Sequence, residues 1–241
     1  MSAPRFFVAG PLAAGAAVTL QDEDLRHARL VLRLQPGDAV VVVGDGAAWD
    51  ARVSALGAGC ASVEVTGKCR EPAHELPQTV TMLQAVPKGA KMDFVIEKAV
   101  ELGAARIVPV RCARSYADLS QSKLRRWRML ARAAAQQSRR LRIPDVESAS
   151  TWASAVERFA PGCEFLLAHE GAARGSLRTA LGDTQLPLTL AVGPEGGFTQ
   201  DELDLAVRAG ARIVSLGPTI LRTETAPLAL LAAVACARDW W

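Results

Sequence analysis

The sequence predicts an α/β protein with a small strand-rich N-terminal domain and a larger domain in which strands and helices alternate. Three observations support this fold class. Short apolar and β-branched runs separated by turn residues fill positions 1–70. A polar stretch with two prolines, Arg70 to Gln78, then interrupts the pattern. Beyond it, strand-like runs alternate with amphipathic helices, which is typical of a parallel sheet covered on both faces.

The N-terminal domain is expected to be a small barrel, because it holds about five short strands and one helix. The strand-like runs read FFVA, AAVTL, DAVVVVGDG, AWDARVSAL and ASVEVTGKC. Gly44-Asp45-Gly46 predicts a tight hairpin between the third and fourth runs. The helix is expected at about residues 22–34, where Pro36-Gly37 would end it.

The second domain is expected to contain at least five strands: TVTMLQAV, ARIVPV, CEFLLAHE, LPLTLAVG and ARIVSLG. Its expected helices are KMDFVIEKAVELG and about residues 120–140, 149–159, 200–209 and 225–237. Ser120 is a suitable N-cap for the long basic helix. These patterns give domain limits of 1–70 and 79–241, with a linker at 71–78.

Composition excludes several classes of protein. Half of the residues are hydrophobic and 22% are charged, so the chain is expected to be globular. No run of eighteen apolar residues predicts a membrane span, and the broken apolar start does not resemble a signal peptide, so we expect a cytoplasmic protein. The five cysteines show no C-x-x-C spacing and no accompanying His cluster, so neither a metal site nor a disulfide framework is expected.

Positive charge is concentrated in two segments although the net charge is only +3. Residues 119–144 contain eight basic residues and no acidic one, and a second basic group lies in DLRHARLVLR. Both groups suit a polyanion such as nucleic acid, whereas the simpler alternative is a solvated helix face.

The motif GPEGG, residues 193–197, lies between a predicted strand and a predicted helix. It lacks the lysine of a phosphate-binding P-loop and the spacing of a dinucleotide fingerprint, and Glu195 would repel phosphate. Thr199-Gln200-Asp201-Glu202 has the pattern of a capping box, so the loop should be held rigidly. Two alternatives remain: a tight turn without a ligand, or the wall of a pocket for a different ligand.

A second loop, LGPTILRTETAPLALL, follows another strand of the same predicted sheet, and AHEG follows a third. Loops at the carboxyl ends of parallel strands meet at one edge of the sheet, so these loops are expected to share a pocket. Ile220 and Leu221 could contact the flat face of a purine there.

The two loops, together with other segments of the chain, resemble motifs of a known family. GPEGGFTQDEL followed by LGPTILRTETAPLALL is similar to the paired C-terminal motifs of the bacterial 16S rRNA (uracil-N3)-methyltransferases, the RsmE family of the SPOUT superfamily. PRFFV, HARLVLRLQPGD, KMDFVIEKAVELGAARIVPV and AAAQQSRR extend the resemblance over nearly the whole chain.

The resemblance implies a PUA-like RNA-binding β-barrel followed by a SPOUT α/β domain with a C-terminal trefoil knot. It also implies a homodimer and the cofactor S-adenosyl-L-methionine, bound by three loops of the knot. The implied cofactor-binding residues are Leu167, Ala168, His169, Gly193, Glu195, Gly196, Gly197, Leu216, Gly217, Ile220 and Leu221.

The implied reaction transfers a methyl group to N3 of a uridine in the decoding region of 16S rRNA or the small ribosomal subunit. Arg222 could stabilise the uracil anion, or it could instead form an ion pair with Glu224 or Glu195. Glu224 is our first catalytic carboxylate. Glu195 and His169 are the other possible bases, although a lone His at a strand end is more often structural.

The expected RNA contacts are basic residues near the two basic segments and at the start of the second domain: Arg26, Arg29, Arg33, Lys88, Lys91, Arg139 and Arg140. Trp127, Trp240 and Trp241 could stack on bases, but core or dimer packing is the simpler interpretation. Two alternative functions remain: a SPOUT enzyme acting on another RNA atom, and a non-catalytic RNA-binding assembly factor.

Overall fold

The structure is a computed structural model that describes residues 3–70, 75–115, 120–172, 176–182 and 186–240. The chain forms two compact units. The first contains residues 1–75 together with 135–142, and the second contains residues 76–134 and 143–241. The segment 71–74 of the expected linker lies outside the described residues.

The first unit is a five-stranded sheet in the order β1-β3-β4-β5-β2. Its strands are β1 (Arg5–Phe7), β2 (Ala17–Leu20), β3 (Ala39–Gly44), β4 (Ala47–Leu56) and β5 (Ala61–Lys68). Only β1 and β3 pair in parallel. Asp45 and Gly46 form the predicted hairpin, and their φ angles of 49° and 72° are those that a two-residue β-turn requires. Alternating valines of β3 to β5 form the core of this unit.

The helix of the first unit differs from its prediction. α1 (Asp22–Arg26) ends after five residues, and the chain continues as a π-helical turn over His27–Val31. Leu25 and Ala28 are buried, whereas Leu30 and Val31 are more than two-thirds exposed. The periodicity predicted helical residues correctly, but apolar spacing alone does not distinguish the wider π turn from an α turn.

The second unit is built on a seven-stranded sheet in which every pair is parallel. The order is β12-β10-β11-β6-β7-β8, and β9 also pairs with β7. The strands are β6 (Val80–Ala85), β7 (Arg106–Arg111), β8 (Asp145–Val146), β9 (Ser150–Thr151), β10 (Glu164–Ala168), β11 (Leu188–Val192) and β12 (Arg212–Val214). The central strands β6 and β11 are buried along their whole length, as both-sided coverage requires.

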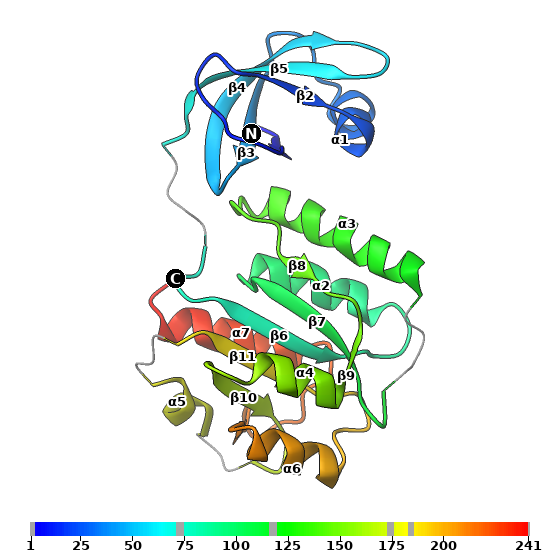
Figure 1. Ribbon diagram of the computed structural model, residues 1–241, viewed down its shortest axis with the longest axis vertical. Helices are drawn as coiled ribbons and strands as arrows, with labels where there is room; N and C mark the ends of the chain where they lie inside the picture. The colour runs from blue at the N-terminus through cyan, green and yellow to red at the C-terminus, as the bar shows by residue number, and fades with distance from the viewer. Residues whose placement is uncertain (1–2, 71–74, 116–119, 173–175, 183–185, 241) are drawn as a thin grey trace. The chain divides into compact units, whose positions relative to one another are not determined.

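Helices cover both faces of this sheet (Figure 1). α4 (Trp152–Phe159) and α6 (Gln200–Arg208) share one core cluster with alternate residues of β6, β7 and β10. α2 (Lys91–Glu101) and α7 (Ala226–Ala237) contact each other, and α7 contacts β11. α5 (Ser176–Leu181) contacts β12.

The carboxylate of Asp93 in α2 contacts two side chains of the long basic helix α3 (Gln121–Gln137). The Trp127 indole N–H donates to Asp93 at 3.0 Å, and Arg126 pairs with the same carboxylate at 2.7 Å. Trp127 is therefore a core residue, which confirms the simpler of its two interpretations. Ser120 accepts the Lys123 N–H at 3.4 Å, as expected of an N-cap.

The sequence did not predict the strands β8 and β9 or the helix α5. The helix expected from residue 149 starts at Trp152 instead, after β9. Two-residue strands contain too few positions to show an alternating pattern. No helix of the described residues has the length and apolarity to cross a membrane.

Candidate functional site

The main cavity of the second unit lies at the carboxyl ends of β10, β11 and β12. Its volume is about 530 Å³, which is within the range of small-molecule sites. Three loops and the start of α2 line it: residues 168–170, 192–198, 215–223, and Lys91 with Ala226. The expected shared pocket of the three loops is therefore present.

The first loop, residues 193–198, is fixed by an aromatic contact beneath it. Phe198 packs on Trp152 with ring centroids 4.7 Å apart. A Cβ atom at Gly193 would lie 3.0 Å from the Phe198 ring, which leaves room only for hydrogen. Gly197 has a φ angle of +69°, a conformation that favours glycine. These two glycines serve the geometry of the loop itself.

Glu202 joins the end of this loop to the segment after β7. The Thr199–Glu202 capping box is complete, with the Thr199 N–H donating to the Glu202 carboxylate at 2.8 Å. The same carboxylate accepts the Ala113 N–H at 2.7 Å. Arg114 donates to the Gly196 carbonyl at 2.8 Å. The loop after β7 therefore supports the first loop from one side.

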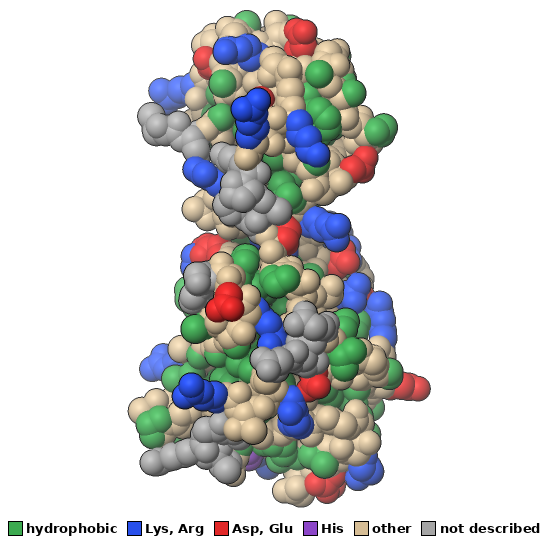
Figure 2. All heavy atoms as spheres, turned by 90° about the vertical axis from the view of Figure 1, so that its left-hand side faces the viewer, with side chains coloured by type: hydrophobic (Ala, Val, Ile, Leu, Met, Phe, Trp, Pro, Cys, Tyr) green, Lys and Arg blue, Asp and Glu red, His purple; other side chains and the backbone are tan. Residues whose placement is uncertain are grey.

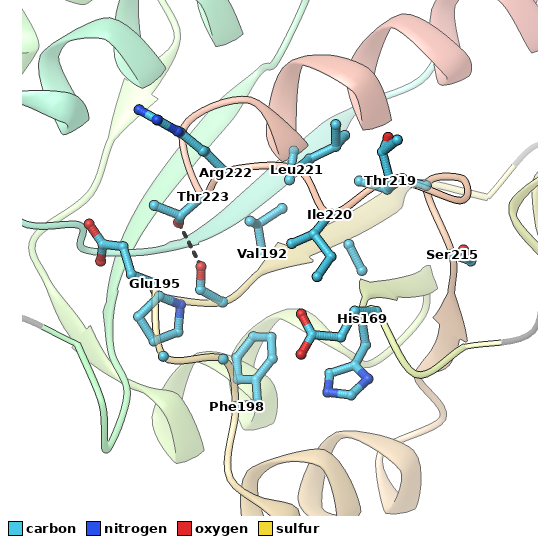
Figure 3. A pocket seen from close by; sticks show the side chains of 18 of the residues that line it. His169, Val192, Glu195, Phe198, Ser215, Thr219, Ile220, Leu221, Arg222 and Thr223 are labelled. Atoms are coloured by element: carbon cyan, nitrogen blue, oxygen red, sulfur yellow. Dashed lines mark hydrogen bonds between the residues drawn. The ribbon is translucent and has the colours of Figure 1, made fainter.

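The second loop, residues 216–222, is much more exposed. Ile220 has 81% of its surface exposed, and Figure 3 shows it pointing into the cavity. Ser215 and Gly217 form a local hydrogen-bonded turn at the start of the loop. The loop therefore presents an apolar side chain to the cavity without burying it.

A buried polar chain joins the two loops below the cavity. The Thr223 hydroxyl donates to the Gly193 carbonyl at 2.7 Å, drawn as a dashed line in Figure 3, and accepts from the Gln84 amide at 3.2 Å. Gln84 is fully buried near the end of β6, and its Oε1 has no hydrogen-bond partner among the described residues. Neither Gln84 nor Thr223 was predicted to belong to the site, because the only signal in the sequence was a Gln inside an apolar strand.

Lys91 connects two carboxylates at the edge of the cavity. Its ammonium lies 3.1 Å from Glu195 and 3.3 Å from Glu224. The hydrogen bond with Glu195 is the largest contribution that raises the pKa of Lys91, and Glu224 adds to it against the effect of burial. Burial alone would raise the pKa of Glu195. Hydrogen bonds from its own N–H, from Lys91 and from the Lys88 N–H outweigh burial and lower it.

Arg222 lines the cavity and is exposed. Its guanidinium makes no ion pair or hydrogen bond with any residue that the structure describes, so the predicted alternative of a pair with Glu195 or Glu224 is absent there; Lys91 occupies both carboxylates. Figure 3 shows Arg222 directed away from His169. A free guanidinium can hold a developing negative charge.

His169 also lines the cavity, but its ring is already engaged. Nδ1 accepts the Gly171 N–H at 3.0 Å. In a neutral ring, Nε2 then carries the proton, which makes this nitrogen a hydrogen-bond donor. This geometry favours the structural role over the catalytic one.

Most of the expected cofactor residues line the cavity: Ala168, His169, Gly193, Glu195, Gly196, Gly197, Leu216, Gly217, Ile220 and Leu221. Leu167 does not, because it is fully buried in the core formed with α4 and α6. Glu224 is also absent from the lining, and its carboxylate lies against Lys91. Phe198, Thr223 and Ser215 line the cavity but were not expected.

The expected RNA-contacting residues are found in different environments. Arg26, Arg29, Arg33 and Lys88 are exposed. For Arg140 the structure corrects the predicted RNA contact. Its side chain is only 3% exposed and pairs with Glu75 at 2.5 Å within the first unit. Its basic neighbours in the sequence gave no sign of this carboxylate 65 residues earlier. Arg139 is half-buried with a φ of +60°, and its carbonyl accepts from Arg5.

Positive charge does not form one continuous patch on the face shown in Figure 2. Lys and Arg side chains are distributed over both units there, with Asp and Glu side chains between them.

Trp240 packs near Gly103, whereas Trp241 lies outside the described residues.

Comparisons with known proteins identify the family. The RNA methyltransferase domain family matches residues 74–235, and the RNA methyltransferase PUA domain family matches residues 20–65. The chain is 38% identical to ribosomal RNA small subunit methyltransferase E of Synechocystis, over 95% of this chain and 76% of the relative. It is 37% identical to the protein of the same name in Mycobacterium tuberculosis, over 100% and 94%.

A solved structure shows the same similarity. The ribosomal RNA small subunit methyltransferase E of Neisseria gonorrhoeae, crystallised with S-adenosyl methionine, superposes with a TM-score of 0.88 at 32% identity, covering 98% of each chain. The family matches together span both units, and these relatives align over almost the full length of this chain. The chain therefore belongs to the ribosomal RNA small subunit methyltransferase E family.

Proposed function

We propose that this RNA methyltransferase uses S-adenosyl-L-methionine to methylate N3 of a uridine in 16S rRNA, in the decoding region near the 3′ end. The single observation that carries the proposal is the cavity between the two loops. It combines an exposed apolar side chain, Ile220, with the guanidinium of Arg222, which has no partner among the residues that the structure describes. The name and ligand of the Neisseria relative support the cofactor and the RNA class.

The residues of the cavity fit this cofactor. Ile220 offers apolar surface that a purine face would cover, and the glycine-rich loops offer backbone groups for its polar edge. Carboxylates near the cavity, Glu195 foremost, suit a positively charged sulfonium. The bound group supplies an electrophilic methyl, which a nucleophilic nitrogen can take.

Arg222 is the proposed catalytic residue. Uracil N3 is a poor nucleophile while it carries a proton, and loss of that proton leaves negative charge spread over N3 and the two carbonyl oxygens. A guanidinium beside a uracil oxygen stabilises this anion and remains charged at any working pH. The methyl then bonds to N3, and the sulfonium becomes a neutral thioether.

Glu195 is the better candidate for proton acceptor, since it lines the cavity and Glu224 does not. Its position at the cavity supports this role, whereas the hydrogen bonds that lower its pKa make the carboxylate a weaker base. Glu195→Gln should therefore lower turnover more than Glu224→Gln. A larger effect at Glu224 would reverse the assignment.

The finer features of the fold belong to the same proposal. The limits 1–70 and 79–241 separate a PUA-like barrel from a knotted SPOUT domain. Thr223 lies against Gly193 and Gln84, so the segment after the edge strand β12 returns to the middle of the sheet, as a knotted chain would. An experimental electron-density map, in which the path of the chain can be traced, would test whether the chain is knotted.

We propose that the protein works as a homodimer in the cytoplasm, where ribosomal RNA is assembled. α7 consists almost entirely of apolar residues, and Leu228, Ala229, Ala232 and Ala233 remain partly exposed on it. A second copy could cover this face. Ala232→Glu should shift the sedimenting species toward the monomer; an unchanged species would place the dimer contact elsewhere.

The function is tested by nucleoside analysis of 16S rRNA from a strain that lacks the gene. The proposal predicts loss of 3-methyluridine and its return when the wild-type gene, but not the Arg222→Ala gene, is supplied. Unchanged 3-methyluridine in the deletion strain would exclude this reaction.

A further inference from the structure

Lys91 stands at the first turn of α2, where the segment after β6 meets both cavity loops. Its ammonium reaches Glu195 in the first loop at 3.1 Å and Glu224, which follows the second loop, at 3.3 Å. The Lys88 N–H donates to the same Glu195 oxygen at 3.2 Å. One short segment therefore contacts both walls of the cavity.

We propose that Lys91 is a positioning residue that bridges the two cavity loops and fixes their separation before any ligand binds. The inference rests on the proposed function only for the identity of that ligand. It replaces the expected role of Lys91 as an RNA contact.

The local charge balance argues against an RNA contact. Lys91 is flanked by two carboxylates, so the three side chains together carry a net negative charge. An RNA phosphate approaching Lys91 would meet Glu195, whose side chain is 33% exposed, as closely as it meets the ammonium. Lys88 is exposed, pairs with no carboxylate in the part of the chain that the structure describes, and remains suited to RNA.

Ion pairs as exposed as these are individually weak, because water screens them. Here the ion pairs act together with a second, buried connection between the same two loops. Gln84, at the other end of the same segment, holds Thr223 and through it the Gly193 carbonyl. The two loops are thus joined at two levels by residues 84–91, so even a weak bridge limits how far they can separate.

Amide hydrogen exchange of the free protein tests the bridge directly. Lys91→Met keeps the apolar stem and removes the charge, and Lys91→Arg keeps the charge. We expect exchange of amides at 193–198 and 219–225 to become roughly threefold to tenfold faster in Lys91→Met, with wild-type rates in Lys91→Arg. Glu224→Gln should give the same loosening.

Lys88→Met is the matched control, since the Lys88 contact to Glu195 uses the backbone N–H and survives the substitution. Its exchange rates should equal those of the wild type. Unchanged exchange in Lys91→Met, or loosening of one loop alone, would overturn the bridge.

Two binding measurements complete the test. S-adenosyl-L-methionine should bind Lys91→Met more weakly, by roughly the same threefold to tenfold, because part of its binding energy must then order the loops. The salt dependence of 16S rRNA binding should not change. A flatter salt slope with unchanged exchange would instead make Lys91 an RNA contact. If the wild type bound no S-adenosyl-L-methionine, the proposed function would fail. The hydrogen-exchange result would still show whether Lys91 bridges the two loops.

Discussion

Residues 193–198 and residues 216–222 face the same cavity, but the protein holds them in different ways. The first loop is supported by Phe198 below, Arg114 at its side and the capping box after it. The second loop turns its apolar tip, Ile220, into open space, and Arg222 has no partner in the described part of the chain. The side chains of the first loop already have protein partners in the free protein, whereas Ile220 and Arg222 of the second loop face the open cavity.

This difference separates stability from function. Apart from Glu195, which lines the cavity, substitutions in the first loop should mainly change the free energy of unfolding, because the contacts of its other residues are already made. Substitutions in the second loop should mainly change binding or turnover, because its side chains have few partners to lose. The predictions below run from the largest expected effect to the smallest.

The largest effect is expected at Arg222. Arg222→Ala should lower turnover by roughly 10²- to 10³-fold, the usual cost of losing one group that stabilises an anion. Cofactor affinity, measured by calorimetry, should change by less than about threefold. Arg222→Lys is the control, since it keeps the charge but not the planar donor set. Equal loss of turnover and affinity would show that Arg222 is structural.

The buried link between the loops should come next. Thr223→Val removes the hydroxyl and leaves the Gly193 carbonyl and the Gln84 amide without their partner. The free energy of unfolding should fall by about 1–3 kcal/mol, measured by urea denaturation. Thr223→Ser keeps the hydroxyl and should lose less than half as much. Similar losses in both variants would trace the effect to the missing methyl contacts instead.

Two alanine substitutions, one in each loop, compare the two walls directly. Gly193→Ala adds a methyl group 3.0 Å from Phe198 and should cost about 1–3 kcal/mol of stability. Ile220→Ala removes an exposed side chain and should change stability by less than about 0.5 kcal/mol. It should nevertheless weaken cofactor binding roughly tenfold, since Ile220 becomes covered only in the complex. The reverse pattern would refute the division of roles.

The smallest effect concerns the pH dependence of Glu195. Its pKa is lowered in the folded protein, so it stabilises the fold above the unfolded value of 4.5, and this stabilisation disappears as pH falls through the folded pKa. The carboxyl is partly exposed, so the contribution should be below about 1 kcal/mol. The difference in unfolding free energy between wild type and Glu195→Gln should shrink from pH 6 to pH 3. A difference that does not change with pH would exclude this linkage.

The sequence was informative where local pattern decides structure. Alternation of strands and helices predicted the parallel sheet, and the rule that ligands bind at the carboxyl ends of such strands brought the three loops together. The capping box predicted the rigid end of the first loop, because its partners lie within four residues.

Contacts between distant residues were not predictable in the same way. The pairing of Arg140 with Glu75, and of Lys91 with Glu195 and Glu224, depends on which segments the fold brings together. The sequence therefore led us to expect RNA contacts at Arg140 and Lys91. The contact of Gly193 with the Phe198 ring was likewise not predicted.

Transfer of a labelled methyl group by the purified protein tests the central claim most directly. Wild-type protein, labelled S-adenosyl-L-methionine and unmodified 16S rRNA or small subunits are combined, and the product nucleoside is identified by mass spectrometry. The account predicts label on N3 of one uridine with the wild type, and almost none with an Arg222→Ala protein that still binds the cofactor. Label on a ribose or on another base, or full transfer by Arg222→Ala, would contradict it.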